Sequence, residues 1–117
     1  MKEPVYSNFN SVIHQYRKNA EKRGLCFDIT ADKFKELTSL KCYYCGTEPS
    51  RIREKCKNKK FVYNGIDRVD NFTGYTDSNC VPCCSSCNIA KHTMTSIEFL
   101  SLIKKIYKNR NLGSEDC

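Results

Sequence analysis

The stretch of sequence that decides the fold lies between two short cysteine motifs, Cys42-Tyr43-Tyr44-Cys45 and Cys84-Ser85-Ser86-Cys87. Each C-x2-C motif can present two thiolates from one tight turn, and four thiolates can close a tetrahedron around Zn²⁺. Gly46 follows the first motif directly and allows the backbone to turn there. We therefore predict one structural zinc site, with the ligands Cys42, Cys45, Cys84 and Cys87.

The composition favours metal over disulfides. The chain has 117 residues, within the ordinary range for one domain. Its apolar share of 39% implies a modest hydrophobic core that needs additional stabilisation, such as a bound metal or disulfides. Its nine cysteines are an odd number, and no apolar run after Met1 suits a signal peptide. We therefore expect a reducing, cytoplasmic location, in a bacterial or phage-infected host cell, and no membrane segment.

The charge balance points to a polyanionic partner. Twenty Lys and Arg residues against 13 Asp and Glu give a formal net charge of +7. Nucleic acid is favoured over a membrane surface, because no basic helix with a wide free apolar face is predicted. The alternative is that the positive charge only keeps a small protein in solution.

Hydrophobic spacing predicts helices on both sides of the cysteine motifs. Residues 8–22 read as a helix that ends at Gly24, and a second helix starts at Thr30 and buries one face. A last helix starts at the capping box of Thr95 and Glu98 and ends within residues 109–113. The buried face of the second helix is expected to hold Phe34, Leu37 and Leu40, and that of the last helix Phe99, Leu102, Ile103 and Ile106.

The segment between the motifs predicts two strands and a helix. Residues 47–60 lack periodicity and read as an exposed basic loop, 61–63 and 66–69 as strand, and 71–78 as a long turn. A short return strand at 80–82 should end at Pro82, and 84–92 should be helical. Cys80 and Cys83 on this return strand are expected to be packing thiols.

Oxygen ligands between and beside the motifs suggest a second metal site. Asp67 and Asn88 offer a carboxylate and an amide oxygen, which suit a hard cation such as Mg²⁺. The alternative is local turn and cap chemistry, which Asp and Asn also favour. The joint spacing of Asp67, Asn79 and Asn88 favours the metal site.

From Cys42 to Lys91 the sequence resembles the HNH endonucleases, the ββα-metal or His-Me finger class, in the four-cysteine zinc-bound form of phages and mobile elements. The resemblance covers about half of the chain. It is carried by Cys42-x2-Cys45-Gly46, Ile66-Asp67-Arg68-Val69-Asp70 with Gly74, Asn79, and Cys84-x2-Cys87-Asn88-x2-Lys91. It implies an α+β fold in which a zinc-stapled ββα-metal motif is flanked by N- and C-terminal helices.

The resemblance also implies the roles of individual residues. Asp67 and Asn88 would hold one catalytic Mg²⁺ or Mn²⁺, Asn79 would hydrogen-bond across the hairpin to orient the base, and Lys91 would contact a phosphate. Most members have His where this chain has Arg68, and a guanidinium cannot accept a proton at working pH. Arg68 could instead bind the scissile phosphate, and His92 or Asp70 would be left to activate water.

The resemblance therefore predicts a divalent-metal-dependent endonuclease that hydrolyses phosphodiester bonds of DNA, with duplex favoured, by nicking or double-strand cleavage. One alternative is a weak or inactive zinc-containing nucleic-acid-binding module, which Arg68 favours, and another is a zinc-built protein-interaction module. One HNH-like domain is expected over 1–117: a helical part at 1–41, the zinc-bound core at 42–92, and the last helix and tail at 93–117. Whether a homodimer forms stays open. Basic residues expected at the nucleic acid, besides Lys91, are Arg51, Arg53, Lys57, Lys59 and Lys60.

Overall fold

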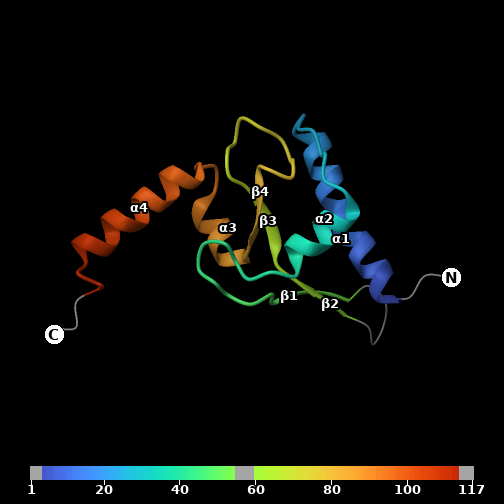
Figure 1. Cartoon of the computed structure of the whole chain (residues 1–117), viewed down its shortest axis with the longest axis horizontal. Coiled ribbons are helices and arrows are strands. Elements are labelled where there is room, and N and C mark those ends of the chain that lie inside the picture. The colour runs from blue at the N-terminus through green and yellow to red at the C-terminus, as the bar shows by residue number, and fades with distance from the viewer. Residues whose placement is uncertain (1–3, 55–59, 114–117) are drawn as a thin grey trace.

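The computed structural model describes residues 4–54 and 60–113, with the side chains of 4–7 left aside, so the predicted contacts of Lys57 and Lys59 lie outside the described residues. Four helices and two small antiparallel sheets make up the described part, which confirms the predicted α+β class (Figure 1). In chain order these are α1 (Pro4–Lys22), α2 (Ala31–Thr38), β1 (Arg51–Arg53), β2 (Phe61–Tyr63), β3 (Gly65–Arg68), β4 (Cys80–Cys83), α3 (Ser85–Lys91) and α4 (Ser96–Asn109).

The core lies where α1 and α2 pack beside the two sheets. Phe9 of α1 packs edge-on against Phe61 of β2, with ring centroids 5.5 Å apart, and Tyr16 packs edge-on against Phe34 of α2 at 5.4 Å. Aromatic pairs of this geometry add to the free energy of burying their apolar area. The left-handed φ of +68° at Gly24 ends α1, and Thr30 caps α2, both as predicted.

The strands β3 and β4 form the hairpin of the expected ββα unit, and α3 follows them directly. Their register pairs Gly65 with Cys83 and Asp67 with Val81. The prediction that Pro82 ends the second strand is wrong by one residue, because Pro82 pairs with Ile66 inside β4. Proline is tolerated there since β4 has a strand neighbour on one side alone among the described residues.

The prediction of a loop over 47–60 needs a correction. Arg51–Arg53 is a strand that pairs with Phe61–Tyr63, and the pairing places Ile52 opposite Val62. Three residues are too few to show an alternating pattern in the sequence. The strand depends on its partner, and the pairing gives Arg51 and Arg53 defined positions.

The last helix carries the predicted capping box, but its apolar face is mostly exposed. Thr95 and Glu98 bond reciprocally at its start. Phe99 is buried, whereas Leu102, Ile103 and Ile106 are each 41–45% exposed, contrary to the prediction. Figure 1 shows the reason, because α4 leaves the body of the protein after its first turn. Leu40 is also 46% exposed, since α2 ends before it.

No helix in the described ranges is both long enough and apolar enough to span a bilayer.

Candidate nuclease site and metal centre

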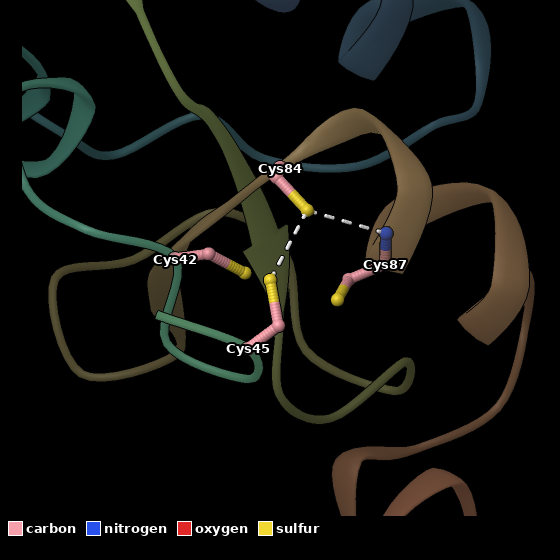
Figure 2. Close-up of side chains that lie close together, drawn as sticks. All are labelled: Cys42, Cys45, Cys84 and Cys87. Atoms are coloured by element: carbon pink, nitrogen blue, oxygen red, sulfur yellow. Dashed lines mark hydrogen bonds between the residues drawn. The ribbon is translucent and has the colours of Figure 1, made fainter. Parts of the chain in front are cut away.

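Four cysteine sulfurs converge at the junction of the first cysteine turn and α3 (Figure 2). All four lie within 4.8 Å of one another, and the Sγ atoms of Cys45 and Cys84 are 3.6 Å apart. A tetrahedron with Zn–S bonds of about 2.3 Å has sulfurs roughly 3.8 Å apart, so the cluster can close around zinc with little movement. The members are the predicted ligands Cys42, Cys45, Cys84 and Cys87.

Local backbone structure places these sulfurs. The backbone N–H of Gly46 donates to the carbonyl oxygen of Cys42 at 2.9 Å, and Gly46 has a left-handed φ of +79°. Cys84 is the N-cap of α3, and its sulfur accepts from the backbone N–H of Cys87 at 3.4 Å. The two motifs therefore form a tight turn and a helix start, as the C-x2-C spacing requires.

The thiol pKa values reflect how closely the four sulfurs are packed. A hydrogen bond from the Thr47 hydroxyl, with help from the backbone, lowers the pKa of Cys45 to about 6. Burial and hydrogen bonds with Cys45 and Cys84 raise the pKa of Cys87. Four thiolates this close repel one another unless a cation lies among them, so the donor set suits Zn²⁺.

The neighbouring cysteines of β4 behave as packing thiols. Cys80 and Cys83 are buried, and burial raises the pKa of each to about 12. Neither belongs to the group of four converging sulfurs. They therefore remain neutral at working pH and contribute apolar contacts, as expected from the sequence.

A buried ion pair fixes the carboxylate of Asp67. The Nζ atom of Lys91 lies 3.3 Å from Oδ1 and 3.2 Å from Oδ2 of Asp67, and it also donates to the carbonyl oxygen of Arg68 at 3.1 Å. The side chain of Lys91 is 1% exposed and that of Asp67 is 9% exposed. Removing either partner would leave an uncompensated charge inside the protein.

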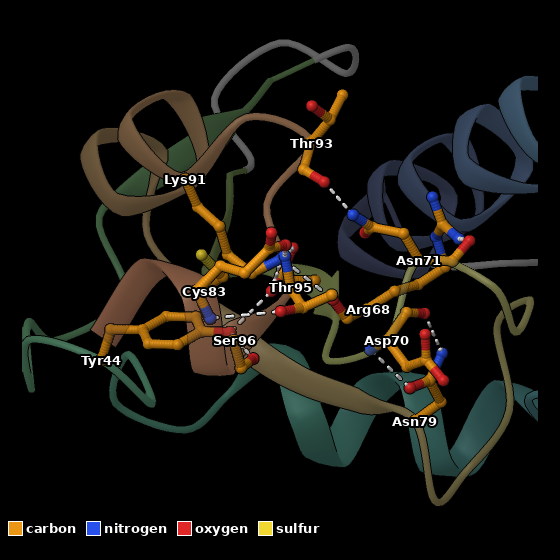
Figure 3. Close-up of polar contacts among 12 residues, drawn as sticks. Tyr44, Arg68, Asp70, Asn71, Asn79, Cys83, Lys91, Thr93, Thr95 and Ser96 are labelled. Carbon is orange, nitrogen blue, oxygen red and sulfur yellow. Dashed lines mark hydrogen bonds and ion pairs between the residues drawn. The ribbon is translucent and has the colours of Figure 1, made fainter. Parts of the chain in front are cut away.

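Tyr44 adds a neutral hydrogen bond to the same carboxylate. Its hydroxyl donates to Oδ2 of Asp67 at 2.8 Å and also contacts the hydroxyl of Ser96 at the start of α4 (Figure 3). Burial, together with the nearby Asp67 charge, raises the pKa of Tyr44, so the phenol stays protonated and remains a donor. Because Tyr44 lies between two clustered cysteines, the cysteine turn and the Asp67 carboxylate are linked through one side chain.

The burial of Lys91 differs from the predicted phosphate contact. An ammonium that is enclosed by Asp67 and a backbone carbonyl cannot also reach a phosphate in solvent. Its position one helical turn after Asn88 instead directs it towards β3. Lys91 therefore neutralises and orients Asp67.

Arg68 and Asn79 hold the turn between β3 and β4. One Nη of Arg68 donates to the carbonyl oxygens of Asn71 and Thr73 at 2.8 and 3.0 Å, and the guanidinium lies over the ring of Tyr75. The amide of Asn79 accepts from the backbone N–H of Asp70 and donates to three carbonyls, at 2.9–3.1 Å. The predicted bridge of Asn79 across the hairpin is present in this form.

A cleft of about 480 Å³ brings the remaining site residues together. Asp67, Asn88 and His92 all line it, so the carboxylate and the amide expected to share a cation face one space. The contacts of Asp67 occupy three of the roughly four lone-pair positions of a carboxylate, which leaves one for a metal. Asn88 is exposed, and its amide makes no side-chain hydrogen bond within 4–54 and 60–113. The donor set therefore fits a hard divalent ion.

The two candidates for water activation differ in position. His92 is exposed, lines the cleft and has a left-handed φ of +53° at the end of α3. Asp70 does not line the cleft, and its Oδ1 accepts from the backbone N–H of Phe72 at 2.9 Å. Geometry favours His92.

Of the basic residues predicted at the nucleic acid, Arg51 and Arg53 line the cleft. Their guanidinium groups donate to the hydroxyls of Ser85 and Ser11, at 2.6 and 2.8 Å. Lys60 is exposed but does not line the cleft. Sequence reasoning missed a polar row that also lines this space, formed by Gln15 and Asn19 of α1 and by Arg23 directly after the helix. No local signal separates this row from an ordinary solvated helix face.

The fold, the sulfur cluster and the cleft together define the class. The chain has the fold of an HNH endonuclease, and the resemblance seen in the sequence is confirmed. No protein-family model matches the chain. In the solved structures, the rare-cutting HNH restriction endonuclease PacI matches with a TM-score of 0.60 and 22% identity, over 88% of this chain and 81% of PacI.

Two relatives are similar in sequence. The SPbeta prophage-derived putative HNH endonuclease YoqL of Bacillus subtilis is 27% identical over 110 residues, which are 87% of this chain and 43% of YoqL. The uncharacterized protein R423 of Acanthamoeba polyphaga mimivirus is 37% identical over 92 residues, which are 79% of this chain and 16% of R423. The chain thus spans less than half the length of either relative.

Loss of the metal from the sulfur cluster should unfold the core. In Cys84→Ser the new hydroxyl can still cap α3, so the loss of one thiolate is the main change. We expect the bound zinc to be lost and the free energy of unfolding to fall by several kcal/mol, since structural zinc supplies folding free energy. Zinc content by mass spectrometry and urea unfolding measure both. Cys26→Ser, an exposed cysteine outside the cluster, is the control, and equal behaviour of the two variants would contradict a structural zinc site.

The Asp67–Lys91 pair should be costly to break from one side. Lys91→Met keeps most of the side-chain volume but leaves the Asp67 carboxylate buried without its cation. We expect the free energy of unfolding to fall by about 3–5 kcal/mol, and added Mg²⁺ or Mn²⁺ to restore part of it. Lys33→Met removes an exposed pair with Glu36 and should cost about 1 kcal/mol or less. A loss for Lys91→Met no larger than this control would show that the pair is not needed.

Proposed function

We propose that this chain is a divalent-metal-dependent endonuclease that hydrolyses phosphodiester bonds of DNA. The observation that carries the proposal is the shared cleft of Asp67 and Asn88, placed next to four guanidinium groups in a protein with an HNH fold. The division into a helical part at 1–41, a metal-bound core at 42–92 and a last helix with tail at 93–117 belongs to the same proposal.

In this proposal each residue of the site has a separate task. Asp67 and Asn88 supply the oxygen ligands for Mg²⁺ or Mn²⁺, and Lys91 and Tyr44 hold the Asp67 carboxylate in one orientation. The bound ion supplies Lewis-acid stabilisation of the charge that develops on the phosphate and on the leaving oxygen. Arg51 and Arg53 bind the substrate backbone, and duplex DNA is the expected substrate.

His92 accepts a proton from the attacking water. It is an exposed imidazole that lines the cleft together with Asp67 and Asn88, and imidazole is the side chain that most often acts as a general base. Arg68 cannot take this task, because its guanidinium stays charged and is bonded to the turn carbonyls. Arg68 instead holds the turn that forms one edge of the cleft.

A second candidate function is a zinc-containing nucleic-acid-binding module with little or no activity. The observation that favours it is Arg68, which stands where most HNH endonucleases have the general base. The same cleft would then bind DNA without cutting it. Measuring cleavage and binding on one preparation separates the two functions.

Removal of the amide ligand should slow cleavage strongly without unfolding the protein. We expect the purified chain to nick supercoiled plasmid with Mg²⁺ or Mn²⁺, and Asn88→Ala to be slower by about 100-fold or more, because loss of one ion ligand removes several kcal/mol of transition-state stabilisation. Asn109→Ala, on the exposed end of α4, should cut at the original rate. Binding without cutting under any divalent metal would favour the second candidate function.

Replacement of the proposed base should slow the chemical step. His92→Asn keeps a residue type that tolerates the left-handed backbone, so the end of α3 should stay intact. We expect the single-turnover rate to fall by about 10²–10⁴-fold while DNA affinity changes little. An unchanged single-turnover rate would exclude His92 as the base.

A further inference from the structure

One wall of the cleft comes from α1, outside the segment that carries the family resemblance. Gln15, Asn19 and Arg23 follow one another at intervals of four residues, and all three are exposed and line the cleft. Asn88 of α3 and His92, which follows α3, line the same cleft. In Figure 1, α1 and α3 lie on opposite sides of the β3–β4 hairpin, so two separate helices contribute lining residues.

The cleft carries an excess of positive charge. Four guanidinium groups line it, from three separate parts of the chain: Arg23, Arg51, Arg53 and Arg68. Asp67 is the one acidic side chain among the lining residues, and its charge is already offset by Lys91. Such a field attracts a polyanion, and a volume of about 480 Å³ lies in the range that suits a bound nucleotide segment.

Arg23 differs from the other three arginines. Arg51 and Arg53 donate to serine hydroxyls, and Arg68 donates to turn carbonyls. Within residues 4–54 and 60–113, the guanidinium of Arg23 has no ion pair and no hydrogen bond. All its donors are therefore available to a phosphate, which a guanidinium can bind with two parallel hydrogen bonds.

The rest of the row is pre-oriented. The Nε2 atom of Gln15 donates to Oδ1 of Asn19 at 3.1 Å, which leaves the amide nitrogen of Asn19 free to donate outwards. The backbone N–H of Arg23 is bonded to the carbonyls of Asn19 and Ala20 at 3.2 and 3.1 Å, so the residue follows α1 in a fixed turn. A pre-ordered surface loses less conformational entropy when it binds a ligand.

Gly65 leaves room for the guanidinium of Arg51, which lines the cleft. A Cβ atom at this position would lie 2.8 Å from Nη1 of Arg51 and would also clash with the hydroxyl of Tyr16. The missing side chain therefore lets the Arg51 guanidinium lie directly against β3, two residues from Asp67. Arg51 thus continues the positive surface from the α1 wall towards the metal ligands.

We propose that the row formed by Gln15 and Asn19 of α1 and by Arg23 directly after it is a second phosphate-binding surface, which holds the DNA backbone beside the scissile phosphate. The inference rests on the proposed function, since it assigns part of the substrate to the same cleft. It makes α1 a substrate-binding element as well as a core helix. Arg23 provides the charge of this surface, and the two amides direct neutral donors at the same strand.

The salt dependence of DNA binding tests this assignment. A labelled duplex is titrated with zinc-loaded protein at several salt concentrations, in buffer without Mg²⁺ or Mn²⁺ so that binding is measured alone. For Arg23→Gln we expect an affinity about 5- to 10-fold lower at low salt. The slope of log affinity against log salt should fall by about 0.9, the value for one lost phosphate contact.

Two matched variants distinguish a phosphate contact made by Arg23 from the general effect of the protein's positive charge. Lys18→Gln removes an exposed charge from the same helix outside the cleft, and it should change the affinity less than about 2-fold. Arg23→Lys keeps the charge and should keep the slope. Zinc content and helical circular dichroism confirm that each variant is folded. Equal effects of Arg23→Gln and Lys18→Gln would overturn the assignment of α1.

Failure of this inference and failure of the proposed function give different results. If Arg23→Gln cleaves normally and its salt slope is unchanged, the α1 surface is rejected and the nuclease function stands. If Arg23→Gln shows the expected change in slope but the original chain cleaves with no divalent metal, the α1 surface stands and the nuclease function is rejected. Absence of DNA binding by the original chain at low salt overturns both.

Discussion

The convergence of four cysteine sulfurs is the constraint on which the site depends. It joins the turn after α2 to the start of α3, two segments about 40 residues apart, within a sphere of a few ångströms. A core of this size buries little apolar surface beyond the contacts of α1, α2 and the sheets, so metal ligation is the natural source of the missing free energy. The first cysteine turn also carries Tyr44, and α3 carries Lys91, Asn88 and the exit to His92. Closing the sulfur cluster therefore arranges nearly every group around Asp67 at once.

The environment of Asp67 resolves a conflict between burial and charge. A carboxylate this deeply buried would be protonated or destabilising without compensation. Lys91 supplies the opposite charge and Tyr44 a neutral donor, and together they leave one oxygen position towards the cleft. The ion pair contributes little net stability compared with an apolar pair. Its value lies in holding the carboxylate in one orientation towards the cleft.

The sequence was informative where one residue type carries a local physical rule. Glycines with left-handed φ follow α1 and the first cysteine pair, and Thr30 and Thr95 cap their helices as expected. It was misleading where the outcome depended on a distant partner. The strand at Arg51–Arg53 exists through pairing with Phe61–Tyr63, and the apolar stripe of α4 stays exposed because the helix turns away from the body. Periodicity predicts that a face is apolar, but it does not say whether anything covers it.

By itself, the sequence determined which four cysteines converge, the caps of α2 and α4, and the β3–β4 hairpin, because each follows from a local rule of spacing or backbone conformation. Only the tertiary structure decided that Lys91 is buried against Asp67, that Arg68 holds a turn, and that α1 supplies the second wall of the cleft. A long basic side chain looks the same in sequence whether it reaches solvent or a buried carboxylate. What distinguishes the two is the set of groups that packing brings within hydrogen-bond distance, and those groups lie more than 20 residues away for Lys91.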